Sequence, residues 1–381
     1  MAIRTIPRRP VPEEEKAVFH KHICPPTHGG PPPDPLPPTV TVSRDLLVAL
    51  DLPLPFTLPN GKSSVPMWIL ADPNDPVGGQ VFPSKLIRVT EGDVVHCRTG
   101  SKTNTHTIHW HGIEPTPMND GVGKHSFEIS GNFTYQWLAG QAGTYFYHCH
   151  KNTTLHFEMG LYGGLIIDPK EPAGSPIKAP YQLGRPGFVA GFSPSTGHVI
   201  PYDVEAFWVI DDIDSRWHLE LENVHDAFMQ KCDPSDPVNP AHFTQDGFLN
   251  DFRPDIFIIN GVARVDDDTP IMDPRVAVNA KVGQTILLRI LHSGYMVQRY
   301  TIGIDAEAIA FDGRPFGVPP FNKYSRPFSI PAGNPFVLTV ARRIELLVRP
   351  TRPGVIPVMV EHLHDITGKR LGIARTVINV S

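Results

Sequence analysis

The chain has 381 residues, of which 40% are hydrophobic and 19% are charged, and its formal net charge at pH 7 is −5. This length suits two domains of ordinary size, each with its own core. The mild acidity argues against nucleic-acid binding, which needs a basic surface, and no apolar run approaches the ~20 residues of a membrane span.

Residues 1–38 are predicted to form an extended arm. The run CPPTHGGPPPDPLPP within it is too rich in proline for regular structure and favours the polyproline conformation. The first residues, MAIRTIPRRPVPEEEK, lack the apolar core of a signal peptide, so no signal peptide is visible in this sequence.

Residues 39–170 are predicted to form one β-sandwich. Short alternating runs such as TVTVSRDLLVAL and KLIRVTEGDVVHCRT are rich in β-branched residues and are separated by turns. The chain has 42 prolines, which interrupt helices and fit many short strands. The fold class is therefore predicted to be all-β.

Residues 171–202 are dense in Pro, Gly and Ser and are predicted to be a linker, and residues 203–381 a second strand-rich domain. The phrase KVGQTILLRIL echoes RVTEGDVVHCRT, which indicates a weak internal repeat and a second sandwich of the same kind. A short helix is expected at residues 223–231.

The four cysteines, Cys24, Cys97, Cys149 and Cys232, form no CxxC pair, which argues against a thiolate zinc site. A Cys24–Cys232 disulfide and free thiols at these two positions both remain open.

Eight histidines fall into three groups that point to copper. Side chains two apart on a strand share a face, so HxH pairs project together and Cys149, between two histidines, points the other way. Two imidazoles and one thiolate suit a blue-copper centre, and His106, Cys149 and His156 can supply them. The HxH pairs suit a second copper site. The three histidine groups are His106, His109 and His111; His148, His150 and His156; and His362 and His364.

These motifs resemble the multicopper oxidases of the cupredoxin superfamily. The words HTIHWHG, MNDGVG, GTYFYHCH and HFEMGLYGGLIIDP look like that family's copper signatures, in its order. The resemblance covers about residues 39–381. It implies two tandem cupredoxin-like Greek-key sandwiches, with His106, Cys149 and His156 as the type 1 copper ligands.

The resemblance leaves the axial position of the type 1 copper open between two residues. Leu161, five residues after His156, matches the family's axial position and is favoured, which implies a three-coordinate copper with a raised potential. Met159 is the alternative ligand, since the longer loop between Cys149 and His156 could reposition it.

The resemblance also assigns the second copper site. It implies that His109, His111, His148 and His150 are the first domain's share of a trinuclear cluster and that His362 and His364 are a second domain's pair. One further HxH pair is expected to align with YTIGID, where Gly303 and Asp305 stand instead. Because that pair is missing, the nitrite-reductase relatives, with one type 1 and one type 2 copper, remain an alternative.

The function expected from this resemblance is an oxidoreductase that passes electrons from a reductant at the type 1 copper to dioxygen at an interdomain copper site. Nitrite reduction and non-enzymatic electron transfer are the alternatives. The donor is a small molecule, a metal ion or a redox protein. Asp120 is the candidate for proton delivery, although its NDG context also fits a plain turn. A homotrimer and a periplasmic or extracellular location follow from the same resemblance.

Overall fold

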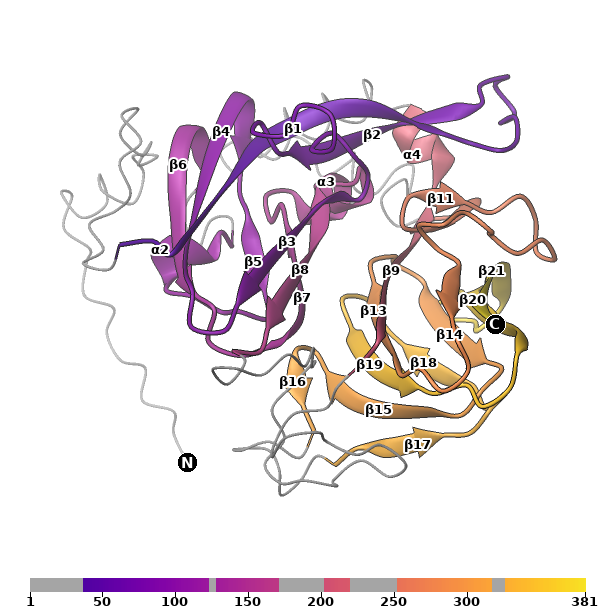
Figure 1. The fold of residues 1–381 in the computed structure, drawn as a ribbon. Coiled ribbons are helices and arrows are strands. Elements are labelled where there is room, and N and C mark those ends of the chain that lie inside the picture. Colours follow the sequence, from indigo (N-terminus) through magenta and orange to yellow (C-terminus); the bar gives the residue numbers. More distant parts are fainter. Residues whose placement is uncertain (1–36, 123–127, 171–201, 220–251, 317–325) are drawn as a thin grey trace, which may run out of the picture.

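The protein folds into two β-sandwiches that lie side by side (Figure 1). The computed structural model describes residues 37–122, 128–170, 202–219, 252–316 and 326–381. The predicted arm and linker, apart from residues 37–38 and 202, lie outside the described residues, as do Cys24, Cys232 and the helix expected at residues 223–231. The prediction of an all-β fold is confirmed, with both strand-rich blocks forming sheets.

Among the described residues, the first sandwich consists of two four-stranded sheets and two short helices. One sheet has the order β2 (Ser64–Ala71), β1 (Val40–Pro53), β4 (Val94–His106) and β6 (Ile129–Leu138). The other has the order β3 (Ser84–Thr90), β8 (Tyr162–Asp168), β7 (Gly143–His148) and β5 (His109–His111). The helices are α2 (Pro117–Asp120) and α3 (Thr153–Glu158).

The second sandwich has larger sheets, and the residues described for this half include the short helix α4 (Ser215–Leu219). Its first sheet runs β11 (Val262–Ala263), β10 (Ile256–Ile259), β9 (Val204–Ile213), β13 (Ile286–His292), β19 (Arg343–Val348), β15 (Ala306–Phe311) and β16 (Arg314–Pro315), with β17 (Phe328–Ile330) paired to β15. Its second sheet runs β12 (Val278–Ala280), β21 (Arg370–Val380), β20 (Gly354–Leu363), β14 (Val297–Ile302) and β18 (Phe336–Leu338).

The strand pairings confirm the internal repeat. In the first sandwich β1 pairs parallel with β4, and β3 pairs parallel with β8. In the second, β9 pairs parallel with β13 and β12 pairs parallel with β21. The antiparallel neighbours β8, β7 and β5 correspond in turn to β21, β20 and β14. Residues on β5 and β7 near the predicted sites therefore have counterparts on β14 and β20 of the other sandwich.

Three buried apolar clusters hold the molecule together. One fills the first sandwich and one fills the second. The third is shared, because Phe146, Phe157 and Tyr162 from the first sandwich lie in one cluster with Ile213 and Leu291 from the second. The strands that carry the histidine motifs are thus packed directly against the second sandwich.

A buried polar network also crosses between the sandwiches. The guanidinium of Arg289 is fully buried and lies 2.6 Å from a carboxylate oxygen of Glu205 and 3.0 Å from one of Glu345. The hydroxyl of Thr144, on β7, donates a hydrogen bond to Glu345. Arg88, on β3, lies 2.6 Å from the second oxygen of Glu205. Buried charges need such partners, so each sandwich completes the polar groups of the other.

We expect the Glu205 contacts to make stability depend on pH. Burial alone would raise the pKa of Glu205, but Arg289 and Arg88 outweigh burial and hold the pKa below its usual value. The ionised carboxylate therefore stabilises the fold near neutral pH, and this contribution is lost as the pH falls through the lowered pKa. Glu205→Gln should cost about 1–3 kcal/mol in urea unfolding at pH 7 and almost nothing well below pH ~4.

Asp51 is an exposed carboxylate on β1 and provides the matched control. Asp51→Asn should leave the unfolding midpoint unchanged at both pH values. An equal loss of stability for Glu205→Gln at neutral and at acid pH would contradict the role given to its charge.

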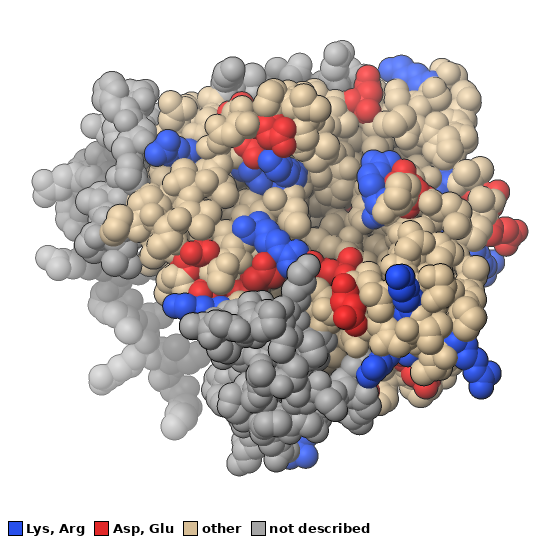
Figure 2. All heavy atoms as spheres, viewed as in Figure 1, with Lys and Arg blue, Asp and Glu red and all other residues tan. Residues whose placement is uncertain are grey.

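The surface agrees with the mild net charge. On the face in Figure 2, basic and acidic side chains of the described residues are interspersed, so no basic field gathers there. No helix among the described residues combines the length and the apolarity required to span a membrane.

Candidate metal centres

The first centre lies at one end of the first sandwich and joins three elements. His106 ends β4, Cys149 directly follows β7, and His156 lies in α3. The Cys149 Sγ is 3.8 Å from the His106 Nδ1 and 3.3 Å from the His156 Nδ1. All three side chains are buried, and their ligand atoms lie within 4.8 Å of one another. Two imidazole nitrogens and one sulfur around a single point fit a type 1 copper.

Burial also sets the protonation of this centre. It raises the pKa of the Cys149 thiol above its usual value. The thiol is therefore protonated at neutral pH when no metal is bound, and a thiolate ligand forms by losing that proton to solvent.

Both candidates for the axial position are fully buried beside the centre. Met159 and Leu161 flank Gly160, whose φ of +105° and contacts with Phe82 and Trp68 leave no room for a side chain. The Leu161 backbone bonds to both neighbouring ligands: its carbonyl accepts from the Cys149 N–H at 2.9 Å, and its N–H donates to the His156 carbonyl at 3.0 Å. The choice between Met159 and Leu161 stays a prediction, with Leu161 favoured.

Two substitutions separate the axial candidates. Leu161→Met should add a thioether ligand and lower the potential of the bound copper, because the axial ligand tunes that potential. Met159→Leu should leave the blue absorption and the potential unchanged. If Met159→Leu instead raises the potential and alters the spectrum, Met159 is the axial ligand. Spectroelectrochemical titration of the two copper-loaded variants measures both effects.

The second centre lies on the other side of the same strand end. In the register of β5 and β7, His109 is opposite His148 and His111 is opposite Phe146. The ligand atoms of His109, His111 and His148 lie within 4.8 Å of one another. The His150 ring completes the group, with its centroid 5.3 Å from that of His109. Four histidines predicted from the HxH pairs are therefore brought together.

Backbone carbonyls orient two of these rings. The His109 Nδ1 is 2.8 Å from the Asp120 carbonyl oxygen, and the His148 Nδ1 is 2.9 Å from the Cys149 carbonyl oxygen. Each Nδ1 then carries the proton, which leaves Nε2 with its lone pair free to bind a metal. The Asp120 carboxylate also lies 3.2 Å from the His109 Nδ1. Its proposed role in proton delivery stays a prediction.

The imidazoles of His111 and His148 are neutral near pH 7. Burial, together with Arg343 and His109, lowers the pKa of His111 to about 3. Burial and the neighbouring histidines also lower the pKa of His148. Neutral imidazoles are the form that binds metal, so these two rings fit copper without a change of protonation.

A cavity of about 440 Å³ between the sandwiches reaches this centre. His111 and Glu114 line it from the first sandwich, and Phe316, Arg342 and Arg343 from the second. The His111 ring stacks on the Phe146 ring, with 4.2 Å between the ring centroids. The Arg343 guanidinium lies 5.5 Å from the centroid of the Phe146 ring. A small solute in this cavity can therefore reach the edge of the histidine group.

The second sandwich does not contribute the expected histidines within one chain. His362 is fully buried, with its Nδ1 3.1 Å from the Asp212 carboxylate, whereas His364 is partly exposed beside Asp365. Neither joins the metal-binding groups found among the described residues. Ligation by His362 and His364 to a copper shared between subunits stays a prediction. The Asp212 contact engages the His362 Nδ1 and leaves its Nε2 available for a metal.

The alignment of the missing pair with Gly303 and Asp305 was wrong. On β14, Gln298 lies opposite His362, as His109 lies opposite His148 on β5. Gln298 and Tyr300 therefore occupy the positions that correspond to His109 and His111. Gly303 follows the strand, and the Asp305 carboxylate accepts a hydrogen bond from the Ala332 N–H in a turn.

Gln298 and Tyr300 fill their site with other side chains. Both are fully buried, the Tyr300 hydroxyl donates to the Gln298 side-chain oxygen, and the Tyr300 ring stacks on Phe336 at 5.1 Å. The strand that carries Phe336, β18, pairs with the outer edge of β14. In the first sandwich β5 is itself the edge strand. In the second sandwich, β18 and its Phe336 side chain therefore cover the position that corresponds to the His109 and His111 pair.

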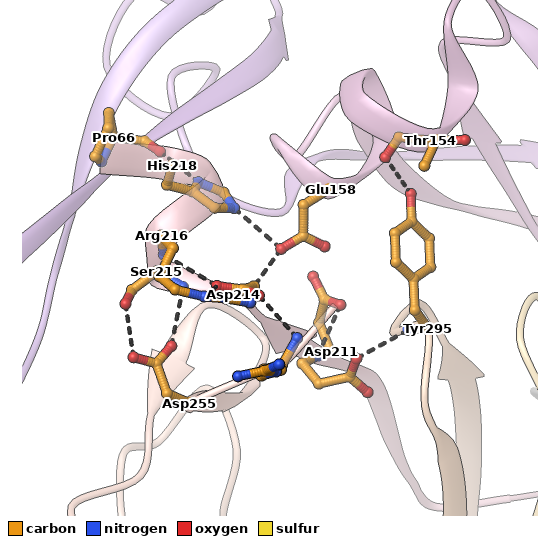
Figure 3. A network of polar contacts seen from close by, with 12 residues as sticks. Pro66, Thr154, Glu158, Asp211, Asp214, Ser215, Arg216, His218, Asp255 and Tyr295 are labelled. Carbon is orange, nitrogen blue, oxygen red and sulfur yellow. Dashed lines mark hydrogen bonds and ion pairs between the residues drawn. The ribbon is translucent and has the colours of Figure 1, made fainter. Parts of the chain in front are cut away.

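A further set of functional contacts was missed by the sequence interpretation. Glu158, two residues after His156, is buried, and its Oε1 accepts a hydrogen bond from the Asp214 N–H at 2.9 Å. The same Oε1 lies 3.3 Å from the His218 Nε2 (Figure 3). No motif in the sequence marks the distant partners of Glu158.

The proton in this contact can be placed. Burial lowers the pKa of His218 to about 4, so its ring is neutral near pH 7. The His218 Nδ1 lies 2.7 Å from the Pro66 carbonyl and therefore carries the one N–H of the ring. Burial also raises the pKa of the Glu158 carboxyl, so a proton is shared between the Glu158 Oε1 and the His218 Nε2.

The fold is a pair of β-sandwiches, and the first of them carries two buried donor sets that suit copper. Residues 77–172 match the sequence model of the multicopper oxidase family. The matched residues lie in the first sandwich and include both donor sets.

Individual relatives agree with this. An L-ascorbate oxidase of Cucumis sativus is 39% identical over 103 residues, 25% of this chain and 17% of that protein. Copper resistance protein A of Pseudomonas syringae pv. tomato is 43% identical over 95 residues, 24% of this chain and 15% of that protein. The match therefore spans under a fifth of either relative.

Solved structures show the likeness of the whole fold. The blue copper oxidase of Nitrosomonas europaea aligns over 89% of this chain and 85% of its own, with a TM-score of 0.57 and 21% identity. The copper nitrite reductase of the same organism aligns over 90% of this chain and 94% of its own, with a TM-score of 0.53 and 16% identity. Both comparisons support the two-sandwich architecture.

Proposed function

We propose that this protein is a copper-dependent oxidoreductase that takes electrons from a reducing substrate and delivers them to dioxygen. The observation that carries this proposal is the pair of donor sets at the end of β7. His148 faces the histidine group, and Cys149, the next residue, faces the thiolate centre. Copper bound there would supply one-electron redox chemistry at the thiolate centre and reduction of the oxidant at the histidine centre.

The residues of the chain define the two ends of this path. His106, Cys149 and His156 would accept electrons, and burial of all three keeps the donor at the protein surface. The cavity beside His111 gives a small oxidant its route. Asp120, in contact with His109, is the candidate for supplying protons. The donor is proposed to be a small molecule, a metal ion or a redox protein.

Nitrite reduction is the second candidate, favoured by one observation. The second sandwich has Gln298 and Tyr300 where a trinuclear cluster would need another histidine pair. A centre built from His109, His111 and His148 alone suits a single type 2 copper. A homotrimer, and a periplasmic or extracellular setting, are proposed from the family resemblance.

The copper content of the fully loaded protein tests these proposals. About four coppers per chain by elemental analysis would support a trinuclear cluster and dioxygen as oxidant. About two would support the nitrite-reductase-like arrangement. One copper per chain would overturn both enzyme proposals and leave an electron carrier. Oxygen uptake and nitrite consumption with a one-electron donor then identify the oxidant.

A further inference from the structure

The segment from Cys149 to Tyr162 carries two of the three donors of the thiolate centre, Cys149 and His156. It is attached to the second sandwich at three points. The Tyr295 hydroxyl donates to the Thr154 carbonyl at 2.6 Å. The Tyr162 hydroxyl donates to the Asp211 carboxylate at 2.5 Å. Between these two points, Glu158 reaches the turn before α4 (Figure 3). The segment from Cys149 to Tyr162 is therefore held from outside its own sandwich.

Glu158 has the most direct connection to the ligands. It lies in the same short helix as His156, and its carboxyl binds both the Asp214 N–H and His218. His218 in turn binds the carbonyl of Pro66 on β2. Trp68, on the same strand, packs edge-on against the His156 ring at 5.6 Å and donates its backbone N–H to the Met159 carbonyl. The contacts thus form a closed ring around His156.

The helix α3 has little stability of its own. It has six residues, and its N-cap residue, Asn152, lies in the left-handed region and makes no capping hydrogen bond with its side chain. Isolated helices of this length do not form in water, so tertiary contacts must fix the position of His156. Outer-shell partners of this kind orient metal ligands and change metal affinity by about 10–100-fold.

We infer that Glu158 is a positioning residue, through which the second sandwich fixes His156 and the axial position of the type 1 copper. The inference rests on the proposed type 1 site. Glu158 does not touch the metal ligands' donor atoms; it sets the place and angle of α3. Through Glu158, the second sandwich then helps to set the geometry of the type 1 site, in addition to any role at the histidine centre.

Three variants test this role in the full-length protein. Glu158→Ala removes the carboxyl, and we expect copper to dissociate from the type 1 site at least about tenfold faster, with a shifted blue band and potential. Glu158→Gln keeps the length of the side chain and an acceptor for the Asp214 N–H, so we expect an effect of under about threefold on the same dissociation. If Glu158→Ala does not fold, Glu158→Asp, which withdraws the carboxyl by one methylene, replaces it.

Thr144→Val is the matched control. It also removes a buried hydrogen bond between the sandwiches, but at the opposite end of β7 from the ligand loop. It should leave the blue band, the potential and the copper dissociation unchanged. A blue band, potential and dissociation equal to wild type in Glu158→Ala, or the same changes in Thr144→Val, would overturn the inference.

Hydrogen exchange of the metal-free protein separates this inference from the proposed function. Peptides from residues 150–162 should exchange faster in Glu158→Ala than in wild type and Thr144→Val. If wild type binds no type 1 copper, the proposed function fails, yet faster exchange still shows that Glu158 holds the loop. Unchanged exchange together with unchanged copper properties rejects the positioning role.

Discussion

Cys149→Ser should abolish the blue absorption of the copper-loaded protein and its turnover, while copper remains bound at the histidine centre. The thiolate is the only sulfur among the three buried donors His106, Cys149 and His156. A serine hydroxyl at this position does not ionise at neutral pH and does not supply the soft ligand that defines a blue-copper centre. Absorption spectra and copper analysis of purified protein measure both parts, with an expected loss of one copper per chain.

The chain offers a matched control for this change. Cys97 lies on β4 of the same sandwich, is equally buried, and takes no part in the metal-binding groups of the described residues. Burial raises the pKa of its thiol to about 12, as expected for an inert core cysteine. Cys97→Ser should cost about 1–3 kcal/mol of stability and keep the blue colour. Retained colour in Cys149→Ser would overturn the assignment.

His148→Ala should have the opposite signature, with the blue colour kept and turnover reduced at least about hundredfold. His148 is the member of the histidine group nearest the thiolate centre along the chain, and its Nε2 lies 3.4 Å from the His111 Nδ1. Removing it takes away one of three converging ligands but none of the donors to the type 1 copper. Steady-state turnover and the absorption spectrum of the same preparation give the result.

A buried histidine outside both centres controls for the loss of an imidazole. His96 lies on β4 and belongs to neither metal-binding group of the described residues. His96→Ala should retain both colour and turnover. If His148→Ala kept full turnover, the histidine group would not be the site of oxidant reduction.

The sequence predicted the first sandwich and its donors well because the information is local. Period-two alternation places His109 with His111 and turns Cys149 away from His148, and the strand register repeats that pattern. The assignment of His106, Cys149 and His156 as type 1 ligands came from the family resemblance, and the structure brings these three side chains together. On a strand, the two-residue spacing in the sequence directly determines which side chains share a face.

The second sandwich was harder to predict because its site depends on register between distant strands. The pairing of Gln298 with His362 depends on hydrogen bonds between β14 and β20, which no local motif records. The buried contact of Glu158 was missed for the same reason. Its partners Asp214 and His218 are 56 and 60 residues away along the chain. A carboxylate beside a ligand motif gives no sign of such partners.

The polar network between the sandwiches has a consequence for how the molecule folds. Arg289 and Glu345 belong to the second sandwich, but the hydroxyl that completes their contact is Thr144 of the first. Apolar side chains of both halves also share one core. Separating the halves would remove the Thr144 contact from the buried Arg289 and Glu345 and would open an apolar face. We therefore expect the two sandwiches to unfold in one cooperative transition, with the ligands of the thiolate centre assembled only when both halves have folded.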